Sequence, residues 1–249
     1  MKIAIVTGAS SGLGKKFAIY SQLFFKDIEE IWIIGRNYKN LLKTAKYINA
    51  NVRIFTMDIT NEEDMEVIKQ TLKEEKPEIE LLVNCAGVGY MGSFSRISED
   101  DNVKMIDVNC KALTVMNYIC IPYMIKGGRI INVASAAAFI AQSNFAVYSA
   151  TKSYVLSLSD SLGKELRKQQ IYVLAVCPGS VNTPFFDEAE KYENRKWFKK
   201  YVMAQSKNVV LKALWDSKKR KTRSIYGLFI ILFYLACKLL PHKLMMKFV

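Results

Sequence analysis

Tyr148 and Lys152 are the two residues of this chain best suited to acid–base chemistry. Four residues apart in a helix, a phenol and an ammonium lie one turn apart on the same face. Moving the pKa of a phenol from near 10 to about 7 requires roughly 4 kcal/mol of preferential stabilisation of the phenolate. One cation about 4 Å away, at an effective dielectric near 20, supplies roughly that amount. The pair therefore predicts a general acid or base near neutral pH; the alternative is a chance spacing on a surface helix.

A glycine-rich turn near the start of the chain has a second chemical use. Residues 2–6 form a short apolar run typical of a buried parallel strand, and a helical pattern follows Gly14. Between them, residues 7–14 read TGASSGLG, a G-x-x-x-G-x-G spacing. Glycines at such a turn let the backbone approach a pyrophosphate, and the positive end of the helix holds its charge. We therefore expect a dinucleotide here, although a glycine-rich turn by itself is often only a turn.

Arg36 indicates which dinucleotide is preferred. A second expected strand, residues 31–34, ends in Gly35, Arg36 and Asn37, about 20 residues beyond the glycine turn, where such folds meet the adenosine ribose. An acidic residue there would bind a free 2′-hydroxyl, whereas a guanidinium suits a 2′-phosphate. The sequence thus favours NADP(H), unless Arg36 is an ordinary solvated charge.

Six separated motifs together resemble one known family. They are residues 7–14, residues 84–87 (Asn-Cys-Ala-Gly), Asn109, Ser135, Tyr148 with Lys152, and Pro178 with Gly179. Their order and spacing are similar to those of the short-chain dehydrogenase/reductase family, clearly up to about Thr183 and less sharply to the end. The resemblance implies one Rossmann-like α/β domain over residues 1–249, with a doubly wound parallel sheet of about seven strands and helices on both faces. It also implies a homodimer or homotetramer.

The same resemblance implies roles for the catalytic residues. Tyr148 would exchange a proton with the substrate oxygen, Lys152 would lower the pKa of Tyr148 and bind the nicotinamide ribose, and Ser135 would polarise the carbonyl. Asn109 would anchor a water molecule that links Lys152 to solvent. Asn109 could instead cap a helix, and Ser135, in a string of small residues, could be a filler.

Further residues would hold the cofactor. Asp58 would contact the adenine amino group; alternatively, it could cap a helix. Thr183 and the Val181 backbone would hold the nicotinamide carboxamide, although Thr183 could instead be an ordinary polar residue of a loop. The full implied set is Gly8, Ser10, Ser11, Gly12, Leu13, Gly14, Arg36, Asp58, Asn84, Ala86, Gly87, Tyr148, Lys152, Pro178, Gly179, Val181 and Thr183. Two departures from the family pattern are Cys85, in place of a second Asn, and Ser11, which is not basic.

Length and periodicity agree with this fold. A chain of 249 residues suits one α/β domain. Apolar runs alternate with helical patterns in the rhythm of a parallel sheet. The runs are residues 3–6, 31–34, 52–55, 81–83, 129–133 and 171–176, and the expected helices are residues 61–75, 99–123 and 146–168. Residues 184–215 are expected to form a variable segment that covers the substrate.

The cysteines and the histidine argue against several other classes of protein. Five cysteines, at positions 85, 110, 120, 177 and 237, show no paired or metal-like spacing, which predicts reduced thiols in a cytoplasmic protein. A single histidine, His242, makes a metal site or a Ser-His-Asp mechanism unexpected. Because the first strand begins at the second residue, we expect no signal peptide.

The net charge of +13 has no single explanation. It could indicate nucleic acid or an anionic membrane surface, but no nucleic-acid motif accompanies it, and we expect no nucleic-acid partner. Basic residues cluster at 195–200 and 218–223. The first cluster is either a solvated helix face or a contact for an anionic substrate handle such as a phosphopantetheine-type arm.

The C-terminal residues 224–249 form an apolar tail. Residues 225–237 carry no charge, yet as a helix they span only about 20 Å, less than the roughly 30 Å of a hydrocarbon core. Such a helix still needs cover, from the substrate pocket, a subunit interface or peripheral contact with a membrane. In each case an apolar segment near the active site favours a lipophilic substrate.

These observations predict an NADP(H)-dependent oxidoreductase that interconverts a ketone and a secondary alcohol. A hydroxysteroid or bile-acid dehydrogenase is the first expectation, and a 3-oxoacyl-thioester reductase is the alternative. A third possibility is an NADP-binding, membrane-associated protein without turnover; the intact Ser135, Tyr148 and Lys152 argue against it.

Overall fold

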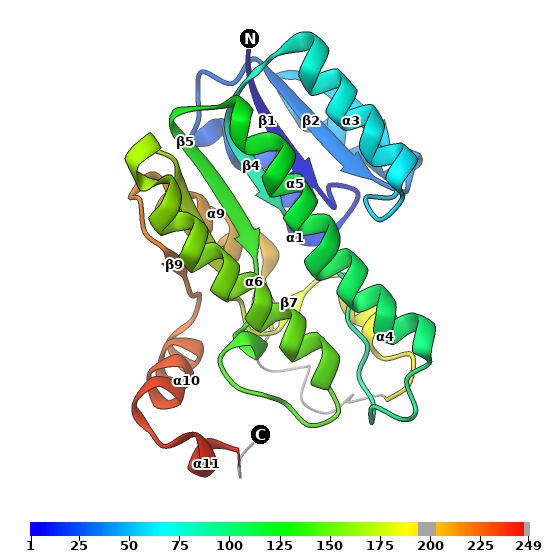
Figure 1. The fold of residues 1–249 in the computed structure, drawn as a ribbon, viewed down its shortest axis with the longest axis vertical. Coiled ribbons are helices and arrows are strands. Elements are labelled where there is room, and N and C mark those ends of the chain that lie inside the picture. The colour runs from blue at the N-terminus through cyan, green and yellow to red at the C-terminus, as the bar shows by residue number, and fades with distance from the viewer. Residues whose placement is uncertain (194–202, 247–249) are drawn as a thin grey trace.

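A seven-stranded parallel sheet forms the centre of the computed structural model, which describes residues 1–193 and 203–246 (Figure 1). Its strands, in spatial order, are β3 (Asn51–Thr56), β2 (Glu30–Gly35), β1 (Lys2–Thr7), β4 (Glu78–Asn84), β5 (Met124–Val133), β6 (Tyr172–Val176) and β9 (Arg223–Ser224). The order reverses between β1 and β4, as in doubly wound folds. The predicted α/β fold with about seven parallel strands is confirmed.

Helices cover both faces of the sheet (Figure 1). One face packs against α1 (Gly12–Tyr20), α2 (Tyr38–Ala45) and α9 (Ser206–Lys218), and the other against α3 (Glu62–Glu75), α5 (Leu113–Cys120) and α6 (Ala146–Glu165). The central strands are apolar on both sides, so alternate residues enter opposite cores: Val6 faces α1, whereas Ile5 faces α3 and α5. Burial of both faces explains why these strands read as continuous apolar runs.

The helix expected at residues 99–123 contains an irregular turn. It consists of α4 (Glu99–Ile106), a π-helical segment Asp107–Ala112, and α5, followed by a short 3₁₀ turn. Ser98 caps α4 by accepting a hydrogen bond from the Asp101 amide (3.3 Å), and Asn61 caps α3 in the same way. The π turn contains Asn109, and such turns occur frequently at functional sites.

The last strand and the C-terminal tail lie beyond this regular core. Strand β9 has only two residues, paired with Ala175 and Val176 of β6. After it come α10 (Leu228–Leu239) and the short α11 (His242–Met245), which project below the sheet in Figure 1. Among the helices of the described residues, none is long and apolar enough to span a bilayer.

The segment expected to cover the substrate, residues 184–215, divides into two parts. Helix α7 (Phe185–Ala189) begins it, and a two-residue strand β8 (Ala204–Gln205) pairs with β7 (Val181–Asn182). From Ser206 onward the chain forms α9, whose Val209, Val210 and Ala213 are buried in the core. The basic cluster at residues 195–200 lies outside the described residues.

Candidate active site

One cavity of about 1480 Å³ lies at the carboxyl ends of the parallel strands. Every predicted site residue except Asn84 and Asn109 lines it, from the glycine turn after β1 to Thr183 after β7. Residues that are far apart in sequence meet here because parallel strands all end at the same edge of the sheet. The cavity therefore unites the predicted cofactor and catalytic residues.

The glycine-rich turn forms a floor of bare backbone. Gly8 and Gly12 have positive φ angles of 68° and 53°, which favour glycine. A Cβ at Gly14 would lie 2.3 Å from the Gly8 carbonyl oxygen, and one at Gly8 would lie 2.8 Å from the Ala86 nitrogen. Because α1 begins at Gly12, the amides of its first turn have no partner within the helix. This surface fits a pyrophosphate.

The Thr7 hydroxyl fixes this floor to the neighbouring strand end. It accepts hydrogen bonds from the amides of Cys85 (3.0 Å) and Ala86 (3.1 Å), directly after β4. Asn84, which does not line the cavity, donates to Asn132 on β5 (2.9 Å) within the buried sheet. Its side chain therefore joins β4 to β5.

The adenosine end of the cavity contains Arg36 and Asp58. The Arg36 guanidinium lies 3.8 Å from the Asp58 carboxylate, and both side chains are partly exposed. Burial favours the neutral form of Asp58, but hydrogen bonds from Thr60 and the charge of Arg36 outweigh it, so the pKa of Asp58 lies below its ordinary value. The other Asp58 oxygen accepts from the Thr60 hydroxyl (2.7 Å) and amide (3.0 Å). Arg36 thus keeps an exposed guanidinium at the end of β2.

Tyr148 and Lys152 lie together on α6, as their spacing predicts. Both are buried, and the Lys152 ammonium nitrogen is 5.6 Å from the centre of the Tyr148 ring. Lys152 Nζ donates to the Val133 carbonyl at the end of β5 (2.9 Å). Ser135, two residues further, lies close enough to Tyr148 to lower the pKa of that phenol, and its hydroxyl accepts a hydrogen bond from the Ala137 amide (3.1 Å). Ser135 and Tyr148 line the same cavity.

The pKa values differ from the sequence-based expectation. Burial raises the pKa of Tyr148 to about 12, and the nearby Ser135 side chain opposes this shift. Burial also lowers the pKa of Lys152 to about 8. A nearby cation favours the phenolate, but burying the phenolate has a larger cost that is not visible in the spacing of the two residues. The interpretation that Lys152 brings the tyrosine near pH 7 is corrected for the protein alone, in which Tyr148 holds its proton.

Asn109 holds three elements together around Lys152. Its side-chain amide donates to the Val88 carbonyl (2.8 Å) and the Thr151 hydroxyl (3.0 Å), and its oxygen accepts from the Val88 amide (3.0 Å). Its side chain therefore joins the loop after β4 to α6 and caps no helix. Thr151, which the sequence reasoning missed, also donates to the Tyr148 carbonyl (2.8 Å). The predicted link to a water molecule stays a prediction.

Aromatic side chains surround the phenol, and the sequence reasoning did not identify them. Phe145 stacks on Tyr148 with ring centres 4.1 Å apart, and Phe185 of α7 lies 5.6 Å away. A Cβ at Gly89 would lie 2.5 Å from the Tyr148 ring. The position of Phe145, three residues before Tyr148, is a signal that helical spacing could have supplied. The Tyr148 ring therefore lies in an apolar part of the cavity that is lined by other aromatic rings.

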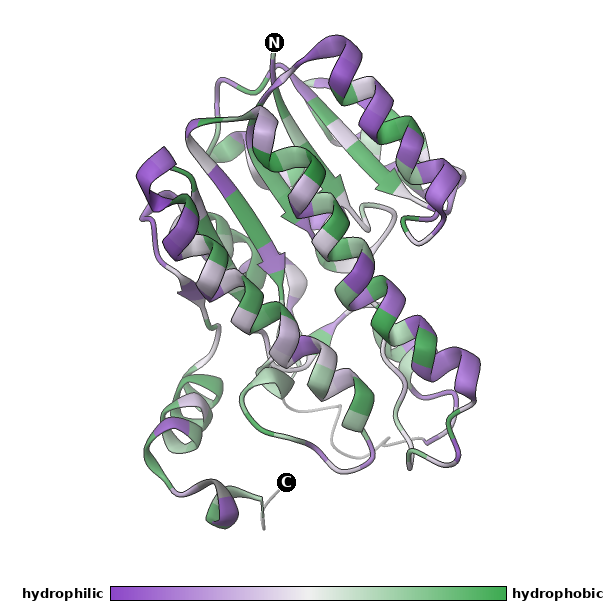
Figure 2. Ribbon diagram, in the orientation of Figure 1, coloured by the Kyte–Doolittle hydropathy of each residue, from purple (hydrophilic) through white to green (hydrophobic). Residues whose placement is uncertain are grey.

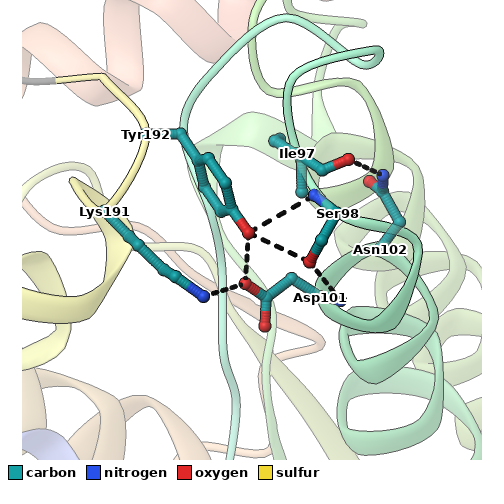
Figure 3. A network of polar contacts seen from close by, with 6 residues as sticks. All are labelled: Ile97, Ser98, Asp101, Asn102, Lys191 and Tyr192. Atoms are coloured by element: carbon teal, nitrogen blue, oxygen red, sulfur yellow. Dashed lines mark hydrogen bonds and ion pairs between the residues drawn. The ribbon is translucent and has the colours of Figure 1, made fainter.

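A polar network fixes the segment that follows α7 to the start of α4 (Figure 3). The Tyr192 hydroxyl donates to the Asp101 carboxylate (2.8 Å) and accepts from the Ser98 amide (3.3 Å). Lys191 Nζ lies 2.8 Å from the same Asp101 oxygen. This network positions one rim of the cavity. The described residues of that rim include the carboxylates of Asp187, Glu188, Glu190 and Glu193.

Replacing Lys152 by Met is expected to stabilise the folded protein at pH 7 by about 2 kcal/mol. The pKa of Lys152 is about 8 in the folded protein and about 10.4 in the unfolded chain, so its charge lowers the free energy of unfolding by about 3 kcal/mol below pH 8. Loss of the Val133 hydrogen bond subtracts about 1 kcal/mol. Between pH 8 and 10.4 the unfolded chain binds more protons, so wild-type stability rises with pH and the advantage of the variant disappears. Urea denaturation at pH 7 and pH 10 measures this; a variant less stable at pH 7 would contradict it.

A metal site is not formed by the described residues, in which no three His, Cys, Asp or Glu side chains are close enough to share an ion. All five cysteines are free, and Cys120 and Cys177 are buried.

Known proteins resemble this chain in sequence and in fold. A family model described as short chain dehydrogenase matches residues 2–194. An uncharacterized oxidoreductase of Staphylococcus epidermidis is 30% identical over 197 residues, which cover 78% of this chain and 84% of that protein. One from Staphylococcus saprophyticus is 32% identical over 195 residues, covering 76% and 82%.

Solved structures show the same fold. A short-chain dehydrogenase from Sphingobium yanoikuyae in complex with NADPH has a TM-score of 0.82 at 24% identity, covering 99% of this chain and 96% of that one. A short-chain dehydrogenase/reductase from Burkholderia phymatum in complex with NAD has a TM-score of 0.82 at 20% identity, covering 99% and 95%. At these identities the similarity concerns the fold.

Proposed function

Because the chain belongs to the short-chain dehydrogenase family, we propose that it is an NADP(H)-dependent oxidoreductase that interconverts a ketone and a secondary alcohol. One observation carries the proposal: Ser135, Tyr148 and Lys152 line the same cavity as the glycine-rich turn. The names of the staphylococcal relatives, which are oxidoreductases, support it.

The residues present fit a nicotinamide dinucleotide. The glycine floor leaves room for the pyrophosphate, and Gly87 leaves room beside Lys152, because a Cβ there would lie 3.3 Å from its Nζ. Arg36 and Asp58 would hold the adenosine end, and Thr183 and the Val181 backbone the carboxamide. The similar structures include one with NADPH and one with NAD, so the preference for NADP(H) is supported by Arg36 alone. The bound cofactor supplies or accepts the hydride.

The catalytic residues move and hold the accompanying proton. In the direction of reduction, Ser135 donates to the carbonyl oxygen and orients it, and Tyr148 gives that oxygen its phenolic proton. A pKa of about 12 keeps Tyr148 protonated at neutral pH, as this direction requires. Lys152 stabilises the phenolate that forms, and Asn109 holds the loop through which a water molecule would return the proton.

The cavity walls support a lipophilic substrate. Phe145, Phe185 and Phe186 lie on one side, and Phe229, Phe233 and Met245 of the C-terminal tail line it as well. We favour a hydroxysteroid or bile-acid dehydrogenase. The alternative, a 3-oxoacyl-thioester reductase, would require a contact for its anionic arm, and the described part of the rim carries carboxylates instead. The five free cysteines suit a reducing, cytoplasmic compartment. We also propose a homodimer or homotetramer, as is common in the family.

A screen of NADPH oxidation tests this proposal directly. Purified protein is incubated with oxo-steroids, oxo-bile acids and 3-oxoacyl thioesters, and absorbance at the nicotinamide band is followed. Turnover of the steroid or bile-acid set is expected. Turnover of the thioesters alone would favour a 3-oxoacyl-thioester reductase. NADPH binding without turnover of any compound would favour an NADP-binding protein that is not an enzyme.

A further inference from the structure

The helix α10 has two apolar faces that meet different surroundings. Its inner face packs on the body of the protein: Tyr234 lies against Phe139, with ring centres 4.9 Å apart. Ile230 covers Gly179, where a Cβ would lie 2.5 Å from Ile230 Cδ1. The Tyr234 hydroxyl also accepts a hydrogen bond from Arg223 (2.6 Å). These contacts hold the helix across the cavity that contains the catalytic residues.

The outer face of α10 is an exposed apolar stripe. Leu228, Leu232, Leu235 and Leu239 follow one another at intervals of four, three and four residues, so they lie on one side of the helix. Their exposed fractions are 73%, 56%, 42% and 77%. The tail continues the stripe with exposed leucines and a methionine around α11, and Figure 2 shows α10 mostly in the hydrophobic colour. A continuous exposed stripe of this kind marks a contact surface.

The charges within the tail itself have one sign. Residues 224–249 contain three Lys residues and no Asp, Glu or Arg. Lys238 and Lys243, which are exposed, lie within the tail itself. An apolar helix face whose own segment carries only basic charges matches an anionic lipid surface. A second copy of this chain fits less well, because an isologous contact would bring the same basic segment against itself.

We propose that α10 and α11 dock on an anionic membrane surface, with the leucine stripe in the interface and the lysines at the headgroups. A helix of 12 residues is about 18 Å long, so it lies along the interface. Gly227, with a φ of 94° and open space where its Cβ would be, joins the helix to the core and permits a change of angle.

The position of α10 connects the proposed membrane contact with the substrate cavity. Phe229, Ile230 and Phe233 line the cavity from the same helix that presents the stripe outward. A lipophilic substrate dissolved in the bilayer would then enter the pocket beside α10 without crossing water. This consequence rests on the proposed function, whereas the lipid contact itself does not.

Vesicle sedimentation tests the contact independently of activity. The full chain is mixed with vesicles of phosphatidylcholine alone, or with one quarter phosphatidylglycerol, at 0.1 M salt. We expect it to sediment with the anionic vesicles and at least tenfold less with the neutral ones. The double variant L232E/L239E should lose at least tenfold in vesicle affinity. The matched control L23E/V103E makes the same charge change at exposed apolar residues outside the tail and should sediment like the wild type.

Each outcome decides the proposal. NADPH binding, measured by fluorescence, verifies that both double variants are folded. If the wild type does not bind NADPH, the result counts against the proposed function and not against the lipid contact. Equal sedimentation of L232E/L239E and the control would overturn the lipid contact, as would a wild type that stays in the supernatant. A wild type that stays in solution as a dimer, with L232E/L239E monomeric by size-exclusion chromatography, would assign the stripe to a second copy instead.

Discussion

Tyr148→Phe is expected to lower kcat/KM at least 1000-fold while NADPH affinity stays within a few-fold. The change removes only the hydroxyl, so the ring keeps its stacking on Phe145 and its place in the cavity. A positioned general acid contributes about 10²- to 10⁴-fold, and no other phenol among the described cavity residues replaces it. Steady-state kinetics in the direction of reduction, with NADPH binding measured by fluorescence, tests this expectation.

Tyr154→Phe is the matched control for this prediction. Tyr154 lies on the same helix, its ring is exposed, and its hydroxyl is 2.7 Å from that of Thr114, away from the cavity. This variant should keep near-normal activity. If Tyr148→Phe also keeps it, the assignment of the proton donor is wrong.

The pH dependence of the two directions gives a second measurement of the same group. Since burial raises the pKa of Tyr148 to about 12, the phenol stays protonated over the ordinary assay range. Reduction consumes this proton and is expected to stay nearly constant from pH 6 to about 7, below the pKa of about 8 at which Lys152 loses the charge that stabilises the phenolate, and to fall above it. Oxidation requires the phenolate, so its rate should rise with pH by up to about tenfold per unit. A rate of oxidation that levels off near pH 7 would show that the cofactor lowers this pKa strongly.

Local patterns predicted most of the sheet but not its last strand. Strands such as β1 and β2 are buried on both faces, so each is a run of branched apolar residues that stands out in the sequence. Strand β9 has only Arg223 and Ser224, and it is held by pairing with β6 and by the bond from Ser224 to Asp216 (2.8 Å). Nothing in its own composition distinguishes it from a loop.

The active site was predictable where spacing within one element determines geometry. Tyr148 and Lys152 share a helix face because they are four residues apart, and the glycine turn is a single local motif. The network between Tyr192 and Asp101 joins residues 91 positions apart, which no local pattern connects. Burial of the phenol likewise depends on Gly89 and Phe185 from other loops. The error in the predicted pKa has this same origin.

The second large effect is expected from Arg36→Ala, which should weaken NADPH binding by roughly 10- to 100-fold and NADH binding by less than about threefold. Hydrogen bonds from a guanidinium to a phosphate contribute about 1.5–3 kcal/mol, and only NADPH carries a 2′-phosphate. Arg36 is half exposed at the end of β2, and its nearest described partner, Asp58, is 3.8 Å away, so its guanidinium is free to turn toward the ribose. Fluorescence titration with each dinucleotide measures both affinities.

Lys39→Ala supplies the matched control for the cofactor prediction. Lys39 is exposed in the first turn of α2, three residues beyond Arg36, so its removal makes the same change in net charge close to the same ribose site. If the effect of Arg36 were only long-range attraction of an anionic cofactor, both variants would weaken NADPH to a similar extent, and salt would reduce the difference. A direct contact instead predicts a loss confined to Arg36→Ala and to the phosphorylated cofactor. If Arg36→Ala weakened the binding of NADPH and NADH equally, this arginine would support the structure of the strand end. The preference between the two cofactors would then depend on other residues.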